Sequence, residues 1–156
     1  MRFSCSANSR EFLKKLFSLK KQKYAQIKIS PLPDDLLDKL IKAGCTIPKQ
    51  CYGNCLSAVT NHLLAEKYVL CFAEIKSGEK LGHAVIKLKD KYYDPTLEIQ
   101  NQKPIRYWLH TEFSKSELRD FVKEQHKHTV PKDGKIEVYP PALREDGTIV
   151  CEEINS

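Results

Sequence analysis

Three residues of this 156-residue chain have the types and the order needed for covalent acyl transfer: Cys51, His83 and Asp94. Cys51 opens a helix-like run, His83 begins an apolar strand-like run, and Asp94 closes the next strand-like run. A thiol that faces an imidazole, with the imidazole held by a carboxylate, is the minimum apparatus for attack by cysteine on a carbonyl carbon. The chemistry requires that the elements around these residues bring their side chains together.

Cys51 is predicted to lie in the first turn of a helix. Pro48 keeps the residue before it extended, so the chain turns there, and the predicted helix begins near Cys51 and runs to about Lys67. A helix N-terminus presents unpaired N–H groups and a partial positive charge, which favour an anionic group. This position suits a nucleophilic sulfur.

His83 and Asp94 fall on a predicted hairpin. The residues after His83 alternate with the two-residue period typical of a strand, and a turn follows at residues 89–91. The returning strand runs antiparallel, so we expect Asp94 beside His83, where a carboxylate orients the ring and stabilises its charged form. Gly82, directly before His83, allows close approach of backbone or substrate.

The remaining elements predict an α+β protein with an antiparallel sheet. Helices are predicted over residues 9–22, 33–43 and 114–127, the last with a capping box formed by Ser114 and Glu117. Strands are predicted over residues 24–29, 68–76 and 105–110, and on both sides of Pro140 and Pro141. Adjacent short strands joined by tight turns favour antiparallel pairing, with the N-terminal helices packed on the sheet.

We expect one domain over residues 1–156. Within it, residues 1–45 form an N-terminal helical part, residues 48–125 a core with the three chemistry-bearing residues, and residues 130–156 a C-terminal hairpin that turns at Asp146 and Gly147.

Composition indicates an ordinary soluble protein. Hydrophobic residues make up 41% and charged residues 29% of the chain, and no apolar run approaches the ~18 residues that span a bilayer. Residues 1–21 are charged throughout and have no apolar core before a small-residue cleavage site, so no secretory signal is predicted. Six cysteines without such a signal indicate free thiols in a reducing compartment, and we expect a cytoplasmic protein with no membrane partner.

The net charge of +6 comes mostly from lysine. The densest block consists of Lys14, Lys15, Lys20, Lys21, Lys23 and Lys28. Such a block attracts nucleic acid or an acidic partner, or it is the solvated face of a helix. We favour the solvated face over nucleic acid, because neither an arginine cluster nor interleaved aromatic residues accompany the lysines.

Four segments carry a family resemblance: QCYGN around Cys51, YVLCFAEI, GHAVI and YYDPT. They resemble the papain-like cysteine hydrolases in their small transglutaminase-like form, which commonly show a Cys-Tyr-x-Asn helix start, a His-Ala strand and an Asp-Pro-Thr end. The resemblance covers about residues 48–125. It implies a papain-like core, Cys51 as nucleophile, His83 as general base and acid, and Asp94 as the orienting group. It also implies a protein or peptide substrate, attacked at an amide, isopeptide or thioester bond, and no cofactor.

The sequence departs from this family at three places. CYGNCLSAV also resembles the papain nucleophile segment, which would select Cys55, but we favour Cys51 because Cys55 would lie one turn inside the helix. Papain relatives carry an oxyanion-donating glutamine several residues before the cysteine, whereas Gln50 is adjacent to it. The expected oxyanion donors are therefore the backbone N–H of Cys51 and the side chain of Gln50 or Asn54. Val85 stands where the family has tryptophan or a small apolar residue, which changes the wall of the site more than its chemistry.

Two alternatives stay open beside the enzyme. The first is a non-catalytic module on the same fold that binds and inhibits a partner protein or binds nucleic acid. The second is a zinc site formed from the cysteines and histidines of the core. The sequence has no C-x-x-C pair, so we expect no metal ligands.

Overall fold

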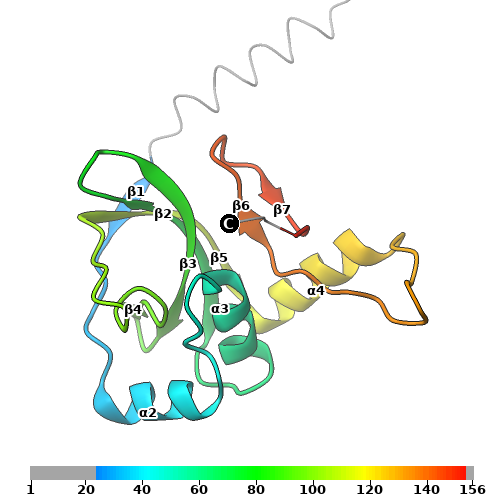
Figure 1. The fold of residues 1–156 in the computed structure, drawn as a ribbon, viewed down its shortest axis with the longest axis horizontal. Coiled ribbons are helices and arrows are strands. Elements are labelled where there is room, and N and C mark those ends of the chain that lie inside the picture. Colours follow the sequence, from blue (N-terminus) through cyan, green and yellow to red (C-terminus); the bar gives the residue numbers. More distant parts are fainter. Residues whose placement is uncertain (1–23, 154–156) are drawn as a thin grey trace, which may run out of the picture.

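A computed structural model describes residues 24–153 of the chain. The elements are β1 (Ala25–Ile27), α2 (Asp34–Lys42), α3 (Cys51–Thr60), β2 (Lys67–Glu74), β3 (Lys80–Leu88), β4 (Lys91–Tyr93), β5 (Arg106–Ser114), α4 (Lys115–His126), β6 (Ala142–Leu143) and β7 (Ile149–Val150) (Figure 1). The helix predicted over residues 9–22 lies outside the described part of the chain. The predicted combination of helices with an antiparallel sheet is confirmed.

The main sheet has the strand order β1-β5-β2-β3-β4, and every neighbouring pair of strands is antiparallel. It curls until its two edges meet, because Ile29, just after β1, forms a bridge with Tyr92 on β4, where the N–H of Ser30 donates to the Tyr92 carbonyl (2.8 Å). Lys89 and Asp90 both have positive φ and form the tight turn between β3 and β4. The hairpin expected to carry His83 and Asp94 is therefore present.

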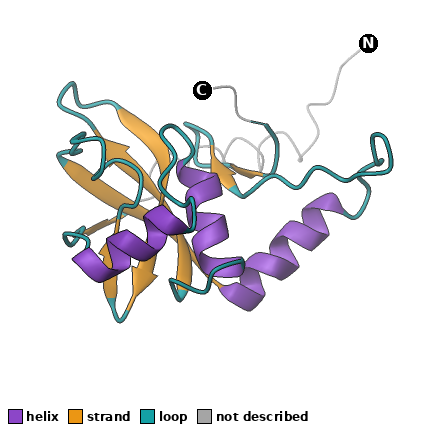
Figure 2. Cartoon of the chain, turned by 60° about the horizontal axis from the view of Figure 1, so that its bottom comes forward, coloured by secondary structure: helices purple, strands orange, loops and turns teal. Residues whose placement is uncertain are grey.

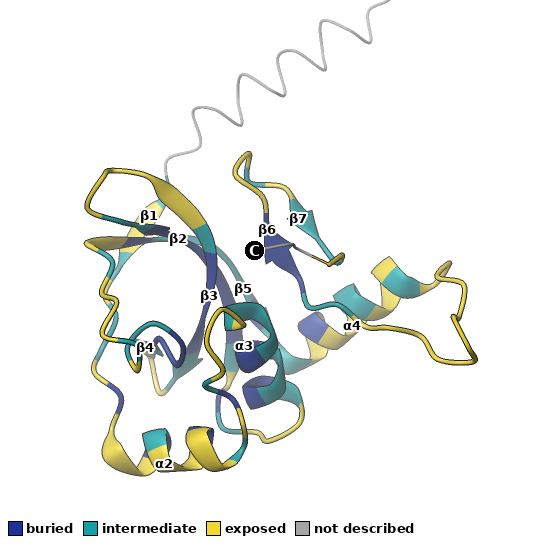
Figure 3. Cartoon of the chain, in the orientation of Figure 1, coloured by how far each residue is buried: buried dark blue, intermediate teal, exposed yellow. Residues whose placement is uncertain are grey.

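Strand alternation divides the apolar residues into two cores. The outer face of β2 and β3 buries Tyr68, Leu70 and Ile86 against α3, which contributes Cys55 and Val59. The inner face of the curl buries a second, smaller core made of Val69, Cys71, Ala73, Val85 and Tyr107. Figure 3 shows the buried residues concentrated on these central strands and on α3. His83 lies on the same face of β3 as this second core.

Of the described helices, α3 is the one that differs from its prediction, at its C-terminal end. α2 matches its predicted range, and α4 begins with the predicted capping box, in which the Ser114 hydroxyl accepts from the Glu117 N–H and the Glu117 carboxylate accepts from the Ser114 N–H. The predicted extension of α3 to Lys67 is wrong, because the helix ends at Thr60 and Leu63 takes a positive φ. Figure 2 shows the short α3 against the sheet and α4 projecting away from it.

The C-terminal strands also differ from the prediction. Both strands of the hairpin, β6 and β7, come after Pro141, and residues 136–140 before it form no strand. The chain between α4 and β6 is mostly exposed (Figure 3). The predicted turn at Asp146 and Gly147 joins β6 to β7, with Gly147 at φ 85°.

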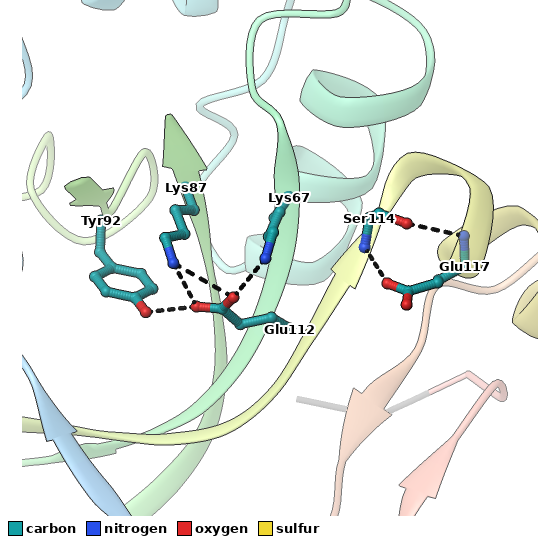
Figure 4. A network of polar contacts seen from close by, with 6 residues as sticks. All are labelled: Lys67, Lys87, Tyr92, Glu112, Ser114 and Glu117. Atoms are coloured by element: carbon teal, nitrogen blue, oxygen red, sulfur yellow. Dashed lines mark hydrogen bonds and ion pairs between the residues drawn. The ribbon is translucent and has the colours of Figure 1, made fainter. Parts of the chain in front are cut away.

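A polar cluster closes the end of the curled sheet away from His83. The Glu112 carboxylate accepts from the ammonium groups of Lys67 (2.9 Å) and Lys87 (3.0 Å) and from the Tyr92 hydroxyl (Figure 4). Burial raises the pKa of Glu112, but these three donors outweigh it and lower the pKa to about 2. The cluster therefore links β2, β3, β4 and β5 through one ionised carboxylate.

Within residues 24–153, every helix is too short or too polar to cross a bilayer.

Candidate active site

Cys51 is the first residue of α3 and is half-buried. Lys49 has a φ of 60°, and this left-handed residue turns the chain into the helix. The Gln50 carbonyl accepts the first helical hydrogen bond from Asn54 N–H (2.8 Å), and no side chain of the described residues caps the helix. The first N–H groups of α3 thus have no partner within the helix and are available to an anion.

Asn54 fixes the approach to Cys51 from inside the fold. Its amide nitrogen donates to the Ile47 carbonyl (2.8 Å) and to the Thr96 hydroxyl (2.9 Å), while its oxygen accepts from the Ile47 N–H (3.1 Å). Only 2% of its surface is exposed. Asn54 therefore ties the loop before Cys51 to the segment after Asp94. Both of its amide hydrogens are already donated, which leaves none for an oxyanion.

His83 and Asp94 form a buried pair. Nε2 of His83 lies 2.8 Å from Oδ2 of Asp94, and the two residues are 5% and 1% exposed. The other carboxylate oxygen, Oδ1, accepts from the backbone N–H groups of Thr96 (3.0 Å) and Leu97 (2.9 Å). The turn after β4 thus holds the carboxylate from one side and the imidazole holds it from the other.

The pKa values of the pair move apart. Burial lowers the pKa of His83, but the charge and hydrogen bond of Asp94, with a smaller contribution from Cys51, outweigh it and raise the pKa to about 10. Burial raises the pKa of Asp94, and the His83 charge together with the hydrogen bonds to the carboxylate outweighs it, so the net pKa is lowered. The pair is therefore an imidazolium and a carboxylate at neutral pH.

Cys51 lies close enough to His83 to act on the charge of its imidazole. β4 pairs with Ile86–Leu88, and within residues 24–153 no strand pairs with the β4 side of the segment that carries His83. α3 packs on the outer face of β3, and its N-terminus brings the Cys51 side chain to the imidazole, where it contributes to the raised pKa of His83. Since Nε2 is bonded to Asp94, Nδ1 is the ring nitrogen left for the sulfur. The structure brings the three predicted residues together.

Tyr107 is a fourth member of the site that sequence reasoning missed. Its hydroxyl donates to Oδ2 of Asp94 (2.7 Å), the same oxygen that His83 contacts, and its ring centroid lies 6.2 Å from that of His83. Tyr107 lies on β5, which pairs with β2 and not with β3. The segment has a strand pattern in the sequence, but only the strand order and the curl place Tyr107 beside Asp94.

The other core thiols are placed differently from Cys51. Cys55 and Cys71 are fully buried, and burial raises the pKa of each well above its usual value. Cys55 points into the outer core one turn after Cys51, whereas Cys71 lies opposite His83 on the inner face. Thiols of this kind are inert packing groups. Their burial favours Cys51 over the alternative nucleophile Cys55.

Gln50 lies at the entrance of the site. It is exposed, and its side-chain oxygen lies over the first turn of α3, 3.8 Å from the point where a Cβ on Gly53 would stand. Its position is compatible with the expected role as an oxyanion donor, together with the backbone N–H groups at the start of α3.

The C-terminal hairpin borders the site through the neighbours of Cys51 and His83. The Tyr52 hydroxyl donates to the Leu143 carbonyl (3.4 Å) and accepts from its N–H (3.3 Å). The Tyr68 hydroxyl donates to the carbonyl of Pro141, the residue before β6. A Cβ on Gly82 would lie 2.8 Å from the Tyr52 hydroxyl and closer still to the Leu143 carbonyl oxygen, so only glycine fits. β6 is thus a wall beside the site.

No group of three or more metal-ligating side chains comes together within residues 24–153. The described cysteines, which are Cys45, Cys51, Cys55, Cys71 and Cys151, are free thiols.

Comparison of the chain with protein-family models, with curated proteins and with solved structures finds no match. The proposed function therefore rests on the geometry of the site.

Proposed function

We propose that this protein is a cysteine hydrolase or acyltransferase that acts on an amide, isopeptide or thioester carbonyl of a protein or peptide. The observation that carries the proposal is the buried pair of His83 and Asp94 (2.8 Å), with Cys51 beside the same imidazole at an uncapped helix start. A papain-like, transglutaminase-like core is part of the proposal. The chain order Cys, His, Asp and the packing of α3 on antiparallel strands support it.

In the acylation step the Cys51 sulfur, as thiolate, attacks the carbonyl carbon and forms a C–S bond. The carbonyl oxygen becomes an oxyanion, which the N–H groups at the start of α3 stabilise. The bond to the leaving group then breaks, and the His83 imidazolium gives its proton to the leaving amine or thiolate. The products are a thioester on Cys51 and a neutral imidazole.

In the second step water or an amine attacks the thioester carbonyl. His83, now neutral, accepts the proton of the nucleophile, and the C–S bond breaks to release an acid or a new amide. The Cys51 thiolate and the imidazolium are restored. Asp94 stabilises the imidazolium in the resting state and, through Nε2, keeps Nδ1 directed to the sulfur.

Acyl transfer from 4-nitrophenyl acetate tests the proposal without a known substrate. We expect a stoichiometric burst of 4-nitrophenolate and an acetyl group located on Cys51 by peptide mass spectrometry. Cys51→Ser removes the burst, whereas Cys151→Ser, which changes the other half-buried described thiol, retains it. His83→Gln slows acylation by about 100-fold or more. Acetylation spread evenly over the cysteines, or a burst that survives Cys51→Ser, would overturn the proposal.

A further inference from the structure

A cavity of about 400 Å³ borders Asp94 and Tyr107 of the candidate site. Residues 26–31, which include the end of β1, form one side, and residues 102–107, which lead into β5, form the other. Figure 1 shows these two segments next to each other on the left of the molecule. Neither Cys51 nor His83 lines the cavity. It is therefore a compartment separate from the place where Cys51 would meet a carbonyl.

The burial of the lining residues distinguishes the floor from the mouth. Asp94 and Tyr107 are 1% and 8% exposed and form the floor. The exposed Lys28, Lys103 and Arg106 lie at the open side. Apolar residues complete the lining: Ile27, Ile29 and Pro104 are partly buried, and Pro31 and Ile105 are exposed. The cavity thus passes from a basic mouth over apolar walls to a polar floor.

The acidic group on the floor of the cavity is already paired, whereas Glu98 accepts one neutral hydrogen bond and keeps its charge. Asp94 is paired with His83 and accepts from Tyr107. Oε1 of Glu98 accepts the N–H of Leu32 (2.9 Å). A cationic ligand would therefore find no free carboxylate on the floor.

The basic groups of the mouth, in contrast, are available. Within the described part of the chain Lys28, Lys103 and Arg106 make no ion pair. Three cations against one free acidic charge, that of Glu98, give the mouth a net positive field. The charge favours an anionic head group, and the walls favour an apolar body.

We propose that this cavity is a binding site for a small apolar molecule that ends in a carboxylate. Its volume lies in the range of small-molecule pockets, roughly 300–1,000 Å³, and apolar walls with a few polar groups at fixed places are typical of them. The anion lies at the basic mouth and the apolar body fills the space above Tyr107. The site does not depend on the proposed acyl transfer, because none of its contacts involves Cys51.

Titration of the full ¹⁵N-labelled chain with 3-phenylpropanoate, followed by NMR, tests the site. We expect saturable binding in the millimolar range or tighter, as a ligand of this size allows. The largest shifts should fall on the amides of residues 27–30 and 105–107. The amine analogue, 3-phenylpropylamine, carries the same apolar body with a positive head and should not bind there.

Charge variants separate a specific site from general attraction to a basic protein. Lys103→Gln with Arg106→Gln should raise the Kd at least about fivefold, the combined effect of two exposed charges. Lys76→Gln with Arg119→Gln removes the same charge from exposed positions outside the cavity and should leave the Kd unchanged. Absence of saturation, shifts elsewhere, equal binding of the amine, or equal weakening by the two double variants would each overturn the proposal. A loss of acyl transfer in Cys51→Ser would not affect it.

Discussion

Replacing Asp94 with asparagine should change the protonation of His83 at neutral pH. The pKa of His83 lies at about 10, against an ordinary value of 6.5, even though burial alone lowers it. This interval corresponds to a preference of about 5 kcal/mol for the charged imidazole in the folded protein. Because the pKa is raised, the stabilisation is fully present below pH 6.5 and is lost as the pH rises through about 10.

In Asp94→Asn the charge disappears while burial stays. The asparagine oxygen can still accept from the N–H groups of Thr96 and Leu97, but its amide then faces the two donors His83 and Tyr107. We expect the pKa of His83 to fall below 6.5, so that the ring is neutral at pH 7. We also expect a loss of about 3–5 kcal/mol in unfolding free energy, as for a broken buried ion pair.

Long-range ¹H–¹⁵N NMR of the histidine rings between pH 5 and pH 10.5 measures both states. His83 is assigned from the signal that disappears in His83→Gln, and circular dichroism checks that each variant is folded. The wild-type ring should stay charged through pH 8, and the ring in Asp94→Asn should be neutral at pH 7. A wild-type His83 that titrates near 6.5, or one whose titration does not change in Asp94→Asn, would show that Asp94 does not raise the pKa of His83.

Three further predictions concern two supports of the site and the polar cluster at the other end of the sheet. Tyr107→Phe keeps the ring but removes the donor to Asp94, and should cost about 1–3 kcal/mol in chemical denaturation; an unchanged midpoint would contradict the role of the hydroxyl. Gly82→Ala should cost about 1–3 kcal/mol because its Cβ overlaps Leu143, whereas Gly53→Ala, whose Cβ would make only an ordinary contact with Gln50 in a helix, should stabilise by up to about 1 kcal/mol; equal effects would contradict the close approach. Glu112→Gln should lose roughly 1–2 kcal/mol at pH 7. Because the folded pKa of Glu112 is about 2 against 4.5, that difference from wild type should disappear as the pH falls from 4.5 to 2; a difference that persists at pH 2 would show that the charge is not its origin.

Local sequence patterns predicted the elements whose structure depends mainly on their own residues. α2, β2, the hairpin of β3 and β4, and the capping box of α4 all follow from periodicity and turn residues. The end of α3 did not, because residues 61–66 keep helical composition while Leu63 takes a left-handed conformation. The segment before Pro140 has a strand pattern but pairs with no strand of the described residues.

The site was predictable to the extent that it depends on sequence neighbours. The β3–β4 hairpin ends one residue before Asp94, whose carboxylate bonds to His83, and the turn after Pro48 starts the helix at Cys51. Contacts between elements distant in the chain had no signal. The position of β5 beside β2 brings Tyr107 to the carboxylate, and the packing of β6 against Gly82 closes one side of the site.

The reactivity of each thiol as a function of pH tests whether Cys51 is the nucleophile. Alkylation of the native chain by iodoacetamide between pH 5.5 and pH 9, quantified by peptide mass spectrometry, compares Cys51 with Cys151, which is also half-buried and whose pKa is raised to about 11 by burial. Because a thiolate beside an imidazolium is the reactive species, Cys51 should react at pH 6 at least about tenfold faster than Cys151. In His83→Gln the rate at Cys51 should fall at least about tenfold, and the rate at Cys151 should stay unchanged. Equal rates at Cys51 and Cys151 in the wild type would contradict the assignment of Cys51 as the nucleophile.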